Sequence, residues 1–362
     1  MRKTLILLVV LALLSGTLAL AQDEIATGWT CPEGFEGQQL NVYNWSTYIA
    51  EDTIVNFEAL CGVTVVYDTF ESSEAAVARL RAGNPGYDIV VPTGADVALL
   101  IDEELIIPLD KEKIPNLENV SDTLINAPFD PENEFSVPYQ WGTVGIGYNT
   151  TTVDEEITTW EQVFNYPDRS VAWLEDRRVM LAVALLMLGH DPNSTDEAEI
   201  DEAKQYLIDH GSNVLYIAGD DGQEILARGE ADIVVEYSGD IFQIMDECEC
   251  DDYAYVIPEE GANIWVDTMV IPDGAQNPDL AHAFIDYILY PQVGADISNY
   301  TAYASPNQTA IDEGLIDEEL LTDPAIYPDE TLRESLFWVR SNLDFEQLYN
   351  DAWDEIKIFI GQ

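Results

Sequence analysis

Four short segments combine an aromatic ring with a carboxylate or hydroxyl side chain near the predicted end of a strand. They are residues 45–48 (WSTY), 237–240 (YSGD), 265–267 (WVD) and 303–305 (YAS). One such ring alone would suggest ordinary core packing. Four of them indicate a binding site, because ligands of α/β proteins bind outside the carboxyl ends of the strands.

The residue types in these segments indicate a cationic, aliphatic ligand. Aromatic rings pack on methylene groups and attract ammonium groups, and a buried carboxylate needs a cationic or hydrogen-bonding partner. The chain holds 69 Asp and Glu but only 14 Lys and Arg, so the ligand could supply the positive charge. A linear polyamine would place methylenes between the rings and ammonium groups on the carboxylates.

No motif predicts an enzyme. The GxSxG nucleophile elbow, the HExxH zinc motif and the GxxxxGK[ST] phosphate loop are all absent. Residues 191–201 faintly match a calcium loop but lack its glycine and its regular oxygen spacing. We therefore predict no catalysis, cofactor or metal. Two alternatives stay open: the same fold binding another ligand, such as a different diamine, an amino compound or a metal ion, and a secreted acid hydrolase.

Length and charge narrow the class of protein further. The 362 residues suit two lobes of roughly 150–180 residues each, and an apolar content of 47% is enough for a core. The net charge of −55 repels phosphate backbones, so we predict no nucleic-acid partner. The same charge also suits a salty or acidic habitat, so it does not identify a ligand by itself.

Residues 1–21 predict a secretory signal peptide. Arg2 and Lys3 precede an apolar run, and residues 19–21 (ALA) form a cleavage site, with the cut expected after Ala21. No later stretch approaches the ~18–20 apolar residues that cross a bilayer. We therefore expect the protein in the periplasm or at the extracellular face of the cytoplasmic membrane.

Export would expose the four cysteines to an oxidising compartment. A bond between Cys31 and Cys61 would tie the N-terminal tail to the first helix, and a bond between Cys248 and Cys250 would close a short loop. Four cysteines allow three pairings, so the connectivity stays open. A zinc site is the alternative, but none of the three histidines lies near a cysteine in the sequence.

The elements that would position these residues follow an α/β pattern. Strands and helices alternate in the first part, which predicts a lobe with a mostly parallel sheet. Its expected elements are strands at 39–45, 63–69 and 87–91 and helices at 51–60 and 75–82. The second part adds strands at 171–174 and 231–237, helices from Trp160 and at 178–188, and a helical C-terminus from Glu330. No linker separates the parts, so the extended stretches 135–149 and 263–271 are expected to cross between lobes.

The sequence resembles the periplasmic polyamine-binding proteins, the substrate-binding components of spermidine/putrescine ABC importers. The likeness covers nearly the whole chain after the signal peptide, at residues 43–74, 87–93, 107–120, 135–149, 188–195, 264–272, 303–307 and 326–337. The NWS-Y and W-V-D segments are fairly specific to the polyamine branch. The order PNST followed by YSGD looks closest to the putrescine-binding type.

This resemblance implies a two-lobed binding protein in which each lobe has a mostly parallel sheet flanked by helices and two strands cross between the lobes. It implies a first lobe of residues 38–142 and 268–311 and a second of 143–267 and 312–362, with the ligand cleft between them. It further implies that a polyamine, putrescine or spermidine, is captured and delivered to a permease with an ATPase partner, without a cofactor. We expect a monomer.

The resemblance also assigns roles to single residues. They are the wall residues Trp45, Tyr48, Tyr237, Trp265 and Tyr303, the hydroxyl contacts Ser46 and Thr93, and the carboxylates Asp176, Asp240 and Asp267. Four family positions differ, because Thr47, Ala95, Val179 and Val339 or Arg340 replace polar or aromatic residues of the family. The contact to a middle or distal amine is therefore open. Glu175 or Glu236 could substitute, although we expect a surface role for each.

Overall fold

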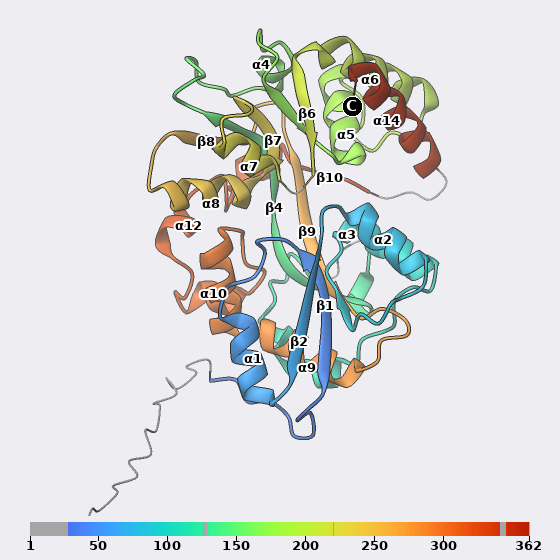
Figure 1. The fold of residues 1–362 in the computed structure, drawn as a ribbon, viewed down its shortest axis with the longest axis vertical. Coiled ribbons are helices and arrows are strands. Elements are labelled where there is room, and N and C mark those ends of the chain that lie inside the picture. Colours follow the sequence, from blue (N-terminus) through green and yellow to red (C-terminus); the bar gives the residue numbers. More distant parts are fainter. Residues whose placement is uncertain (1–27, 126, 128, 220, 341–344, 362) are drawn as a thin grey trace, which may run out of the picture.

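The computed structural model describes residues 28–125, 127, 129–219, 221–340 and 345–361. It has two α/β lobes, one above the other, joined by long strands that run from one lobe into the other (Figure 1). The expected two-lobed fold is therefore present. The predicted signal peptide lies outside the described residues.

One mixed sheet runs through both lobes. Its strands are β1 (Gln39–Trp45), β2 (Thr64–Phe70), β3 (Ile89–Val90), β4 (Ser136–Asn149), β5 (Val171–Leu174), β6 (Val214–Ala218), β7 (Ile233–Tyr237), β8 (Tyr253–Val256), β9 (Asn263–Val270) and β10 (Phe337–Trp338). The order is β2-β1-β3-β9-β4-β7-β5-β6, with β10 beside β9 and β8 beside β4. β1 is parallel to β2 and β3, and β5 is parallel to β6 and β7. Each lobe thus has the parallel core that its alternating strands and helices predict.

β4 and β9 are the two expected crossover strands. They pair antiparallel with each other, starting with Ser136 opposite Val270, and both continue from the lower into the upper lobe (Figure 1). Their register shifts between Pro138 and Gln140, where proline has no N–H to donate to the ladder. The sheets of the two lobes are therefore continuous through this pair.

Helices of the lower lobe in Figure 1 begin and end where local sequence favours it. They are α1 (Thr53–Cys61), α2 (Ser73–Arg81), α3 (Gly94–Asp102), α9 (Pro278–Ile288), α10 (Pro291–Thr301) and α11 (Gln308–Asp312). The side chain of Ser72 accepts from the Ala75 N–H and caps α2. Gly62 ends α1 in the left-handed conformation, with φ 66°.

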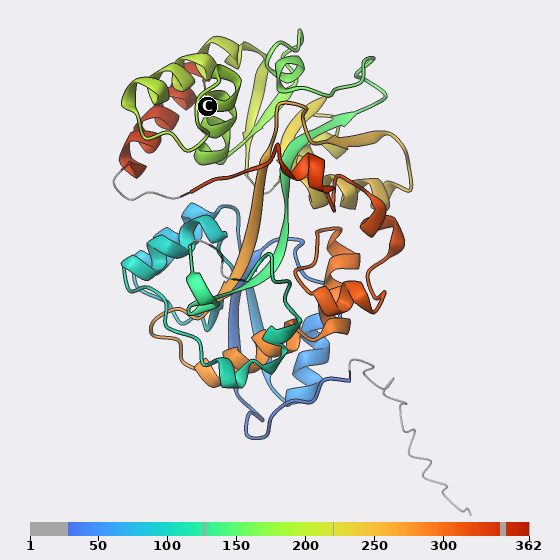
Figure 2. The same ribbon diagram turned by 180° about the vertical axis from the view of Figure 1, so that it is seen from behind.

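The upper lobe holds a second set of helices. They are α4 (Trp160–Phe164), α5 (Arg177–Leu188), α6 (Glu197–His210), α7 (Gly222–Ala227), α8 (Ser238–Cys248) and α14 (Glu346–Ile360). The short helices α12 (Glu318–Thr322) and α13 (Glu330–Arg333) lie in the segment that leads from the lower lobe to α14 (Figure 2), and Leu320 of α12 packs against the lower-lobe cluster of Ala295 and Ala310. Thr159 and Gln162 form a capping box at α4. Trp160 and Trp173 are fully buried and anchor the core of this lobe.

The C-terminus from Glu330 is helical in α13 and α14, as predicted, but the prediction is wrong for the stretch between these helices, where β10 lies. α13 ends at Arg333, and β10 then pairs parallel with β9. The side-chain amide of Asn263 donates to the carbonyl of Phe337 (3.2 Å). This contact joins residues 74 positions apart, so a reading of local helical pattern misses it. Trp338 of β10 is 41% exposed, so its ring does not anchor this segment in the core.

Both predicted disulfide bonds are present. Cys31 is bonded to Cys61 at the end of α1, and Cys248 to Cys250 just after α8. All four sulfur atoms are therefore paired, which excludes the zinc alternative that would use them. Within the described part of the chain, no group of three or more His, Cys, Asp or Glu side chains could hold a metal ion.

Candidate functional site

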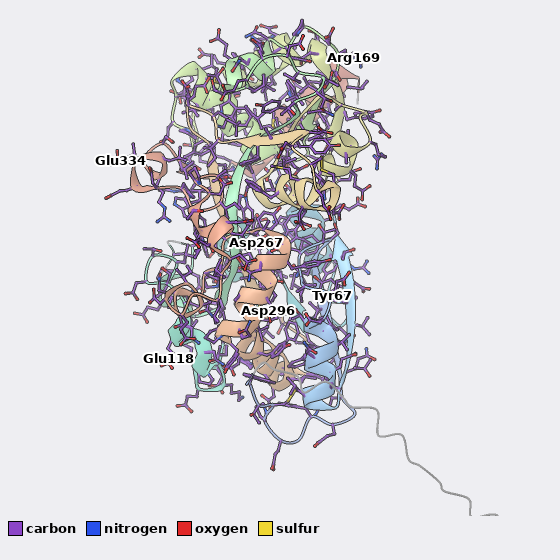
Figure 3. The ribbon with its side chains drawn as sticks, turned by 90° about the vertical axis from the view of Figure 1, so that its left-hand side faces the viewer. Tyr67, Glu118, Arg169, Asp267, Asp296 and Glu334 are labelled. Carbon is purple, nitrogen blue, oxygen red and sulfur yellow. A yellow bond between two sulfur atoms is a disulfide. The ribbon has the colours of Figure 1, made fainter. Side chains whose placement is uncertain are left out.

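A cleft of about 370 Å³ lies between the lobes and is lined by both of them. The ten residues predicted for the site all lie on its wall: Trp45, Ser46, Tyr48, Thr93, Asp176, Tyr237, Asp240, Trp265, Asp267 and Tyr303. Figure 3 shows Asp267 near the middle of the molecule, at the level where the lobes meet. The fold therefore brings together segments that are up to about 250 positions apart, because the parallel strands of each lobe end at this cleft.

Five rings follow one another around the cleft, and we call them the aromatic box. The centroid distances are 6.3 Å from Trp45 to Tyr237, 5.7 Å from Tyr237 to Trp265, 5.2 Å from Trp265 to Tyr303 and 5.1 Å from Tyr303 to Tyr48. Neighbouring rings cross at 62° to 86°, so they form differently oriented walls and not a stack. Such walls suit a thin alkyl chain.

Trp45 and Tyr48 are held in place by hydrogen bonds to neighbouring residues. Trp45 ends β1, and its indole Nε1 donates to the carbonyl of Val91 (3.0 Å). A turn at Thr47 follows with φ 46°, which is unusual for a β-branched residue, and both residues that flank Thr47 line the cleft. The carbonyl of Tyr48 accepts from the hydroxyl of Tyr139 (2.6 Å). Both rings are thus positioned by contacts outside the cleft.

Two glycines make room for other rings of the box. A Cβ atom at Gly142 of β4 would lie 2.8 Å from Cζ2 of Trp265. A Cβ atom at Gly239 of α8 would lie 2.6 Å from the ring of Tyr303. Both distances are shorter than real contacts of a Cβ atom, so a side chain at either position would displace the ring.

Asp240 and Asp267 bring negative charge to the aromatic box. Their exposed fractions are 3% and 5%. Asp267 lies on β9, opposite Gln140 of β4, and its backbone forms an isolated antiparallel β-bridge with that of Thr93. Asp240 lies in the first turn of α8, where the helix dipole favours a carboxylate.

The Tyr48 phenol feels both of these carboxylates. Burial raises its pKa well above the ordinary value of 10.0, and the charges of Asp267 and, less strongly, Asp240 raise it further. The phenol therefore keeps its proton at physiological pH and can serve as a hydrogen-bond donor in the box.

The cleft continues beyond the aromatic box to a second charged group, which we call the far end. It comprises Glu74, Asp96, Asp176, Arg177 and Arg178. Asp176 caps α5, because its Oδ1 accepts the N–H groups of Arg178 (2.9 Å) and Val179 (3.0 Å). Glu74 of α2 pairs with Arg177 of α5 (2.5 Å). Apart from Asp176, sequence reasoning missed these residues; Glu74 and Arg177 are 103 positions apart, so no local signal links them.

The two glutamates considered as substitutes have other partners. Glu175 accepts from Nζ of Lys357 (2.8 Å) and from Nε1 of Trp353 (3.3 Å). Glu236 lies on β7 and accepts from the N–H of Tyr237 (2.9 Å). It is fully buried, so the surface role expected for it is wrong, and it is not among the described residues that line the cleft.

This fold and cleft define the chain as a two-lobed solute-binding protein. The family model for bacterial extracellular solute-binding proteins matches residues 52–328, and the chain belongs to that family. It is 32% identical to the putrescine-binding periplasmic protein PotF of Escherichia coli (strain K12) over 365 residues, which covers 95% of this chain and 97% of the relative. It is 34% identical to the putrescine-binding periplasmic protein SpuD of Pseudomonas aeruginosa (strain UCBPP-PA14), over 83% of this chain and 87% of the relative.

Solved structures agree with this assignment. A putative spermidine/putrescine ABC transporter from Listeria monocytogenes superposes with a TM-score of 0.83 at 34% identity, covering 89% of this chain and 99% of the neighbour. The substrate-binding protein PotD from Streptococcus pneumoniae gives a TM-score of 0.75 at 33% identity, covering 90% and 100%. The resemblance to polyamine-binding proteins and the expected fold are thereby confirmed. Among the residues that the structure describes, no helix is long and apolar enough to span a membrane.

Proposed function

We propose that this protein captures a polyamine outside the cytoplasmic membrane and delivers it to the permease of an ABC importer. One observation carries the proposal: five rings and two buried carboxylates converge on one cleft between the lobes. A protonated polyamine is a thin alkyl chain with ammonium groups. The rings suit its methylenes, and the carboxylates suit its charges.

Each site residue has a part in this proposal. Asp240 and Asp267 bind one ammonium end, and the aromatic box encloses the alkyl chain. The hydroxyls of Ser46 and Thr93, which also line the cleft, accept hydrogen bonds from the ammonium groups. Asp176 lies at the far end of the cleft, where it can meet the further ammonium group of a triamine.

Closure of the lobes would bury the ligand. We propose that residues 38–142 with 268–311 and residues 143–267 with 312–362 move as two bodies, with β4 and β9 as the hinge. In this arrangement the rings of the box come from both bodies, so the ligand itself stabilises the closed form. We further propose that a signal peptide cut after Ala21 releases the chain outside the membrane. There it acts as a monomer, without a cofactor, and docks on the permease with its ATPase.

One observation favours the alternative of an amino compound that carries an oxygen acceptor. Trp265 lines the cleft, and its buried indole Nε1 has no hydrogen-bond partner among the described residues. A fully protonated polyamine has no acceptor for this donor, whereas an amino acid has one. An acid hydrolase is less well supported, because it calls for a close carboxylate pair without an aromatic wall.

Titration calorimetry with a ligand panel tests the proposal. Putrescine, cadaverine and spermidine are compared with glutamate, 4-aminobutyrate and arabinose, and each ligand is also tested for its effect on the melting temperature. Amines should bind and raise the melting temperature, since a ligand that binds only the folded state stabilises it. Binding of an amino acid with no response to any polyamine would replace the proposal by the alternative.

A further inference from the structure

The negative charges on the cleft wall fall into two separate groups. Asp240 and Asp267 act on Tyr48, inside the aromatic box. Glu74 at the far end is affected instead by Asp176, Arg177 and Asp96. The two groups share no member, so the cleft offers a polyamine two acidic regions that differ in their surroundings.

The far end already contains a cation of the protein. The guanidinium of Arg177 lies 2.5 Å from Oε1 of Glu74 and 3.1 Å from Oε1 of Glu346, and its side chain is only 13% exposed. The chain has 14 basic residues against 69 acidic ones. Basic residues are therefore rare in this chain, and one of them lies at the far end. Arg177 begins α5 and Glu74 lies in the first turn of α2; Figure 1 shows α5 in the upper lobe and α2 in the part of the lower lobe that faces it.

The neighbouring carboxylates at the far end also have partners. Asp96 accepts from Oγ of Ser73 (2.5 Å), and Asp176 accepts the two backbone N–H groups that cap α5. Arg178 is turned toward α14, with its Cζ 4.2 Å from the ring centroid of Tyr349. An ammonium group that entered this region would have to share or displace these contacts.

Glu74 presents no free charge to an incoming ammonium in either protonation state. Burial, and then the charge of Asp176, raise its pKa to about 7 from the ordinary 4.5, while Arg177 lowers it. The ionised carboxylate is paired with Arg177, and the protonated group is neutral. A third amine therefore finds little net attraction beside Glu74.

We propose that Arg177 acts as a built-in counter-ion that takes the place of a distal ammonium group at Glu74, so that the cleft selects diamines over triamines. This deepens the proposed function and rests on it. A diamine needs the aromatic box and the carboxylates nearest to it. A triamine must carry a further ammonium to the far end and compete there with a guanidinium that is already in place.

Replacing Arg177 tests this role. Dissociation constants for putrescine and spermidine are measured in the wild type, Arg177→Gln and Arg177→Lys at about pH 8, which lies above the Glu74 pKa of about 7 in the wild type. In Arg177→Gln, an ammonium group bound beside Glu74 would replace Arg177 as the positive charge that lowers this pKa. The wild type should prefer putrescine. Arg177→Gln should strengthen spermidine binding up to about fivefold relative to putrescine, or about 1 kcal/mol, since a partly exposed ion pair contributes up to about that much. Arg177→Lys keeps the charge and should keep the preference, and thermal melts verify that each variant folds.

A matched control separates charge from lobe closure. Glu346→Gln removes the contact of Glu346 on α14 with Arg81 on α2 (3.7 Å), which joins the lobes, but leaves the pair of Arg177 with Glu74 intact. If these ion pairs act only by holding the lobes together, Arg177→Gln and Glu346→Gln should each change the affinity for both amines alike. If Arg177 acts as a counter-ion, only Arg177→Gln should change the ratio, and the double variant Glu74→Gln with Arg177→Gln should restore it.

The outcomes separate this inference from the proposed function. If the wild type binds no amine, the proposed function fails. If both amines bind and the wild type favours spermidine, or if Arg177→Gln leaves the ratio unchanged, the counter-ion role is wrong while polyamine binding stands.

Discussion

Replacing Asp267 by asparagine is the most direct test of the proposed site. The change keeps the shape of the side chain on β9 and removes its charge. Asp267 is 5% exposed, so an ammonium bound to it would be largely desolvated. The substitution removes the charge-assisted hydrogen bond between the Asp267 carboxylate and the ligand's ammonium group, so the amine should bind more weakly.

The size of the effect follows from this burial. Truncating one partner of a buried charge pair costs about 2–5 kcal/mol. Asp240 acts on the same Tyr48 phenol and would still attract the ammonium, so we expect the lower part of that range. A loss of about 2–3 kcal/mol weakens binding about 30- to 150-fold.

Titration calorimetry with putrescine measures this loss directly. Glu175→Gln is the matched control, because Glu175 also lines the cleft but its carboxylate already accepts a hydrogen bond from Lys357. The affinity of the Glu175→Gln variant for putrescine should stay within about threefold of the wild-type value. The unliganded Asp267→Asn protein should be no less stable than the wild type, since a buried charge is removed. Equal affinities of Asp267→Asn and the wild type would show that the amine does not bind in the aromatic box.

Four further changes test other parts of the structure. Trp45→Ala should weaken putrescine binding by about 1–3 kcal/mol through lost ring contact, and calorimetry that showed no change would remove Trp45 from the site. Gly142→Ala should lower both affinity and melting temperature, because its Cβ would lie 2.8 Å from Trp265; an unperturbed protein would contradict the tight packing. Replacing Cys31 and Cys61 by serine should lower the free energy of unfolding by about 3 kcal/mol in urea titrations, and a loss of affinity without a loss of stability would argue against a purely structural bond. Glu74→Gln should gain stability over the wild type by about 1 kcal/mol as the pH rises from about 5 to about 8. Burial raises the pKa of Glu74 to about 7, so the protonated carboxyl group stabilises the folded wild type. The wild type loses this stabilisation as the pH rises through about 7, whereas the glutamine does not titrate. Because Glu74 is 35% exposed, the difference in the free energy of unfolding stays small. A pH-independent difference in urea unfolding would refute this.

Local sequence predicted residues that the structure brings to one cleft, because strand ends carry their own signal. The ring-and-acid segments at Trp45 and at Trp265 to Asp267 end or follow runs of strand-forming residues, so their position in an α/β sheet could be inferred. Local pattern likewise predicted β1 and the start of α4 at Trp160, where Thr159 and Gln162 form a capping box. These are properties of neighbours in the chain.

Local pattern failed where one segment is shaped by a distant one. Residues after Arg333 have helical periodicity, yet β10 forms because β9 offers an unpaired edge and Asn263 binds the carbonyl of Phe337. In the same way, the sequence predicts a surface role for Glu236, but Glu236 is buried because β7 lies between β4 and β5. Pairing energies between strands exceed the small differences in local propensity.

By itself, the sequence determined the α/β class, the crossover strands and ten of the residues that line the cleft, and it suggested the two disulfide bonds without fixing their pairing. The tertiary structure alone decided that the lobes share one sheet and that Arg177 meets Glu74 across the cleft. The physical reason is range: propensity and periodicity act over a few residues, whereas the charge that an amine would meet depends on which side chains the two lobes bring within a few ångströms of each other.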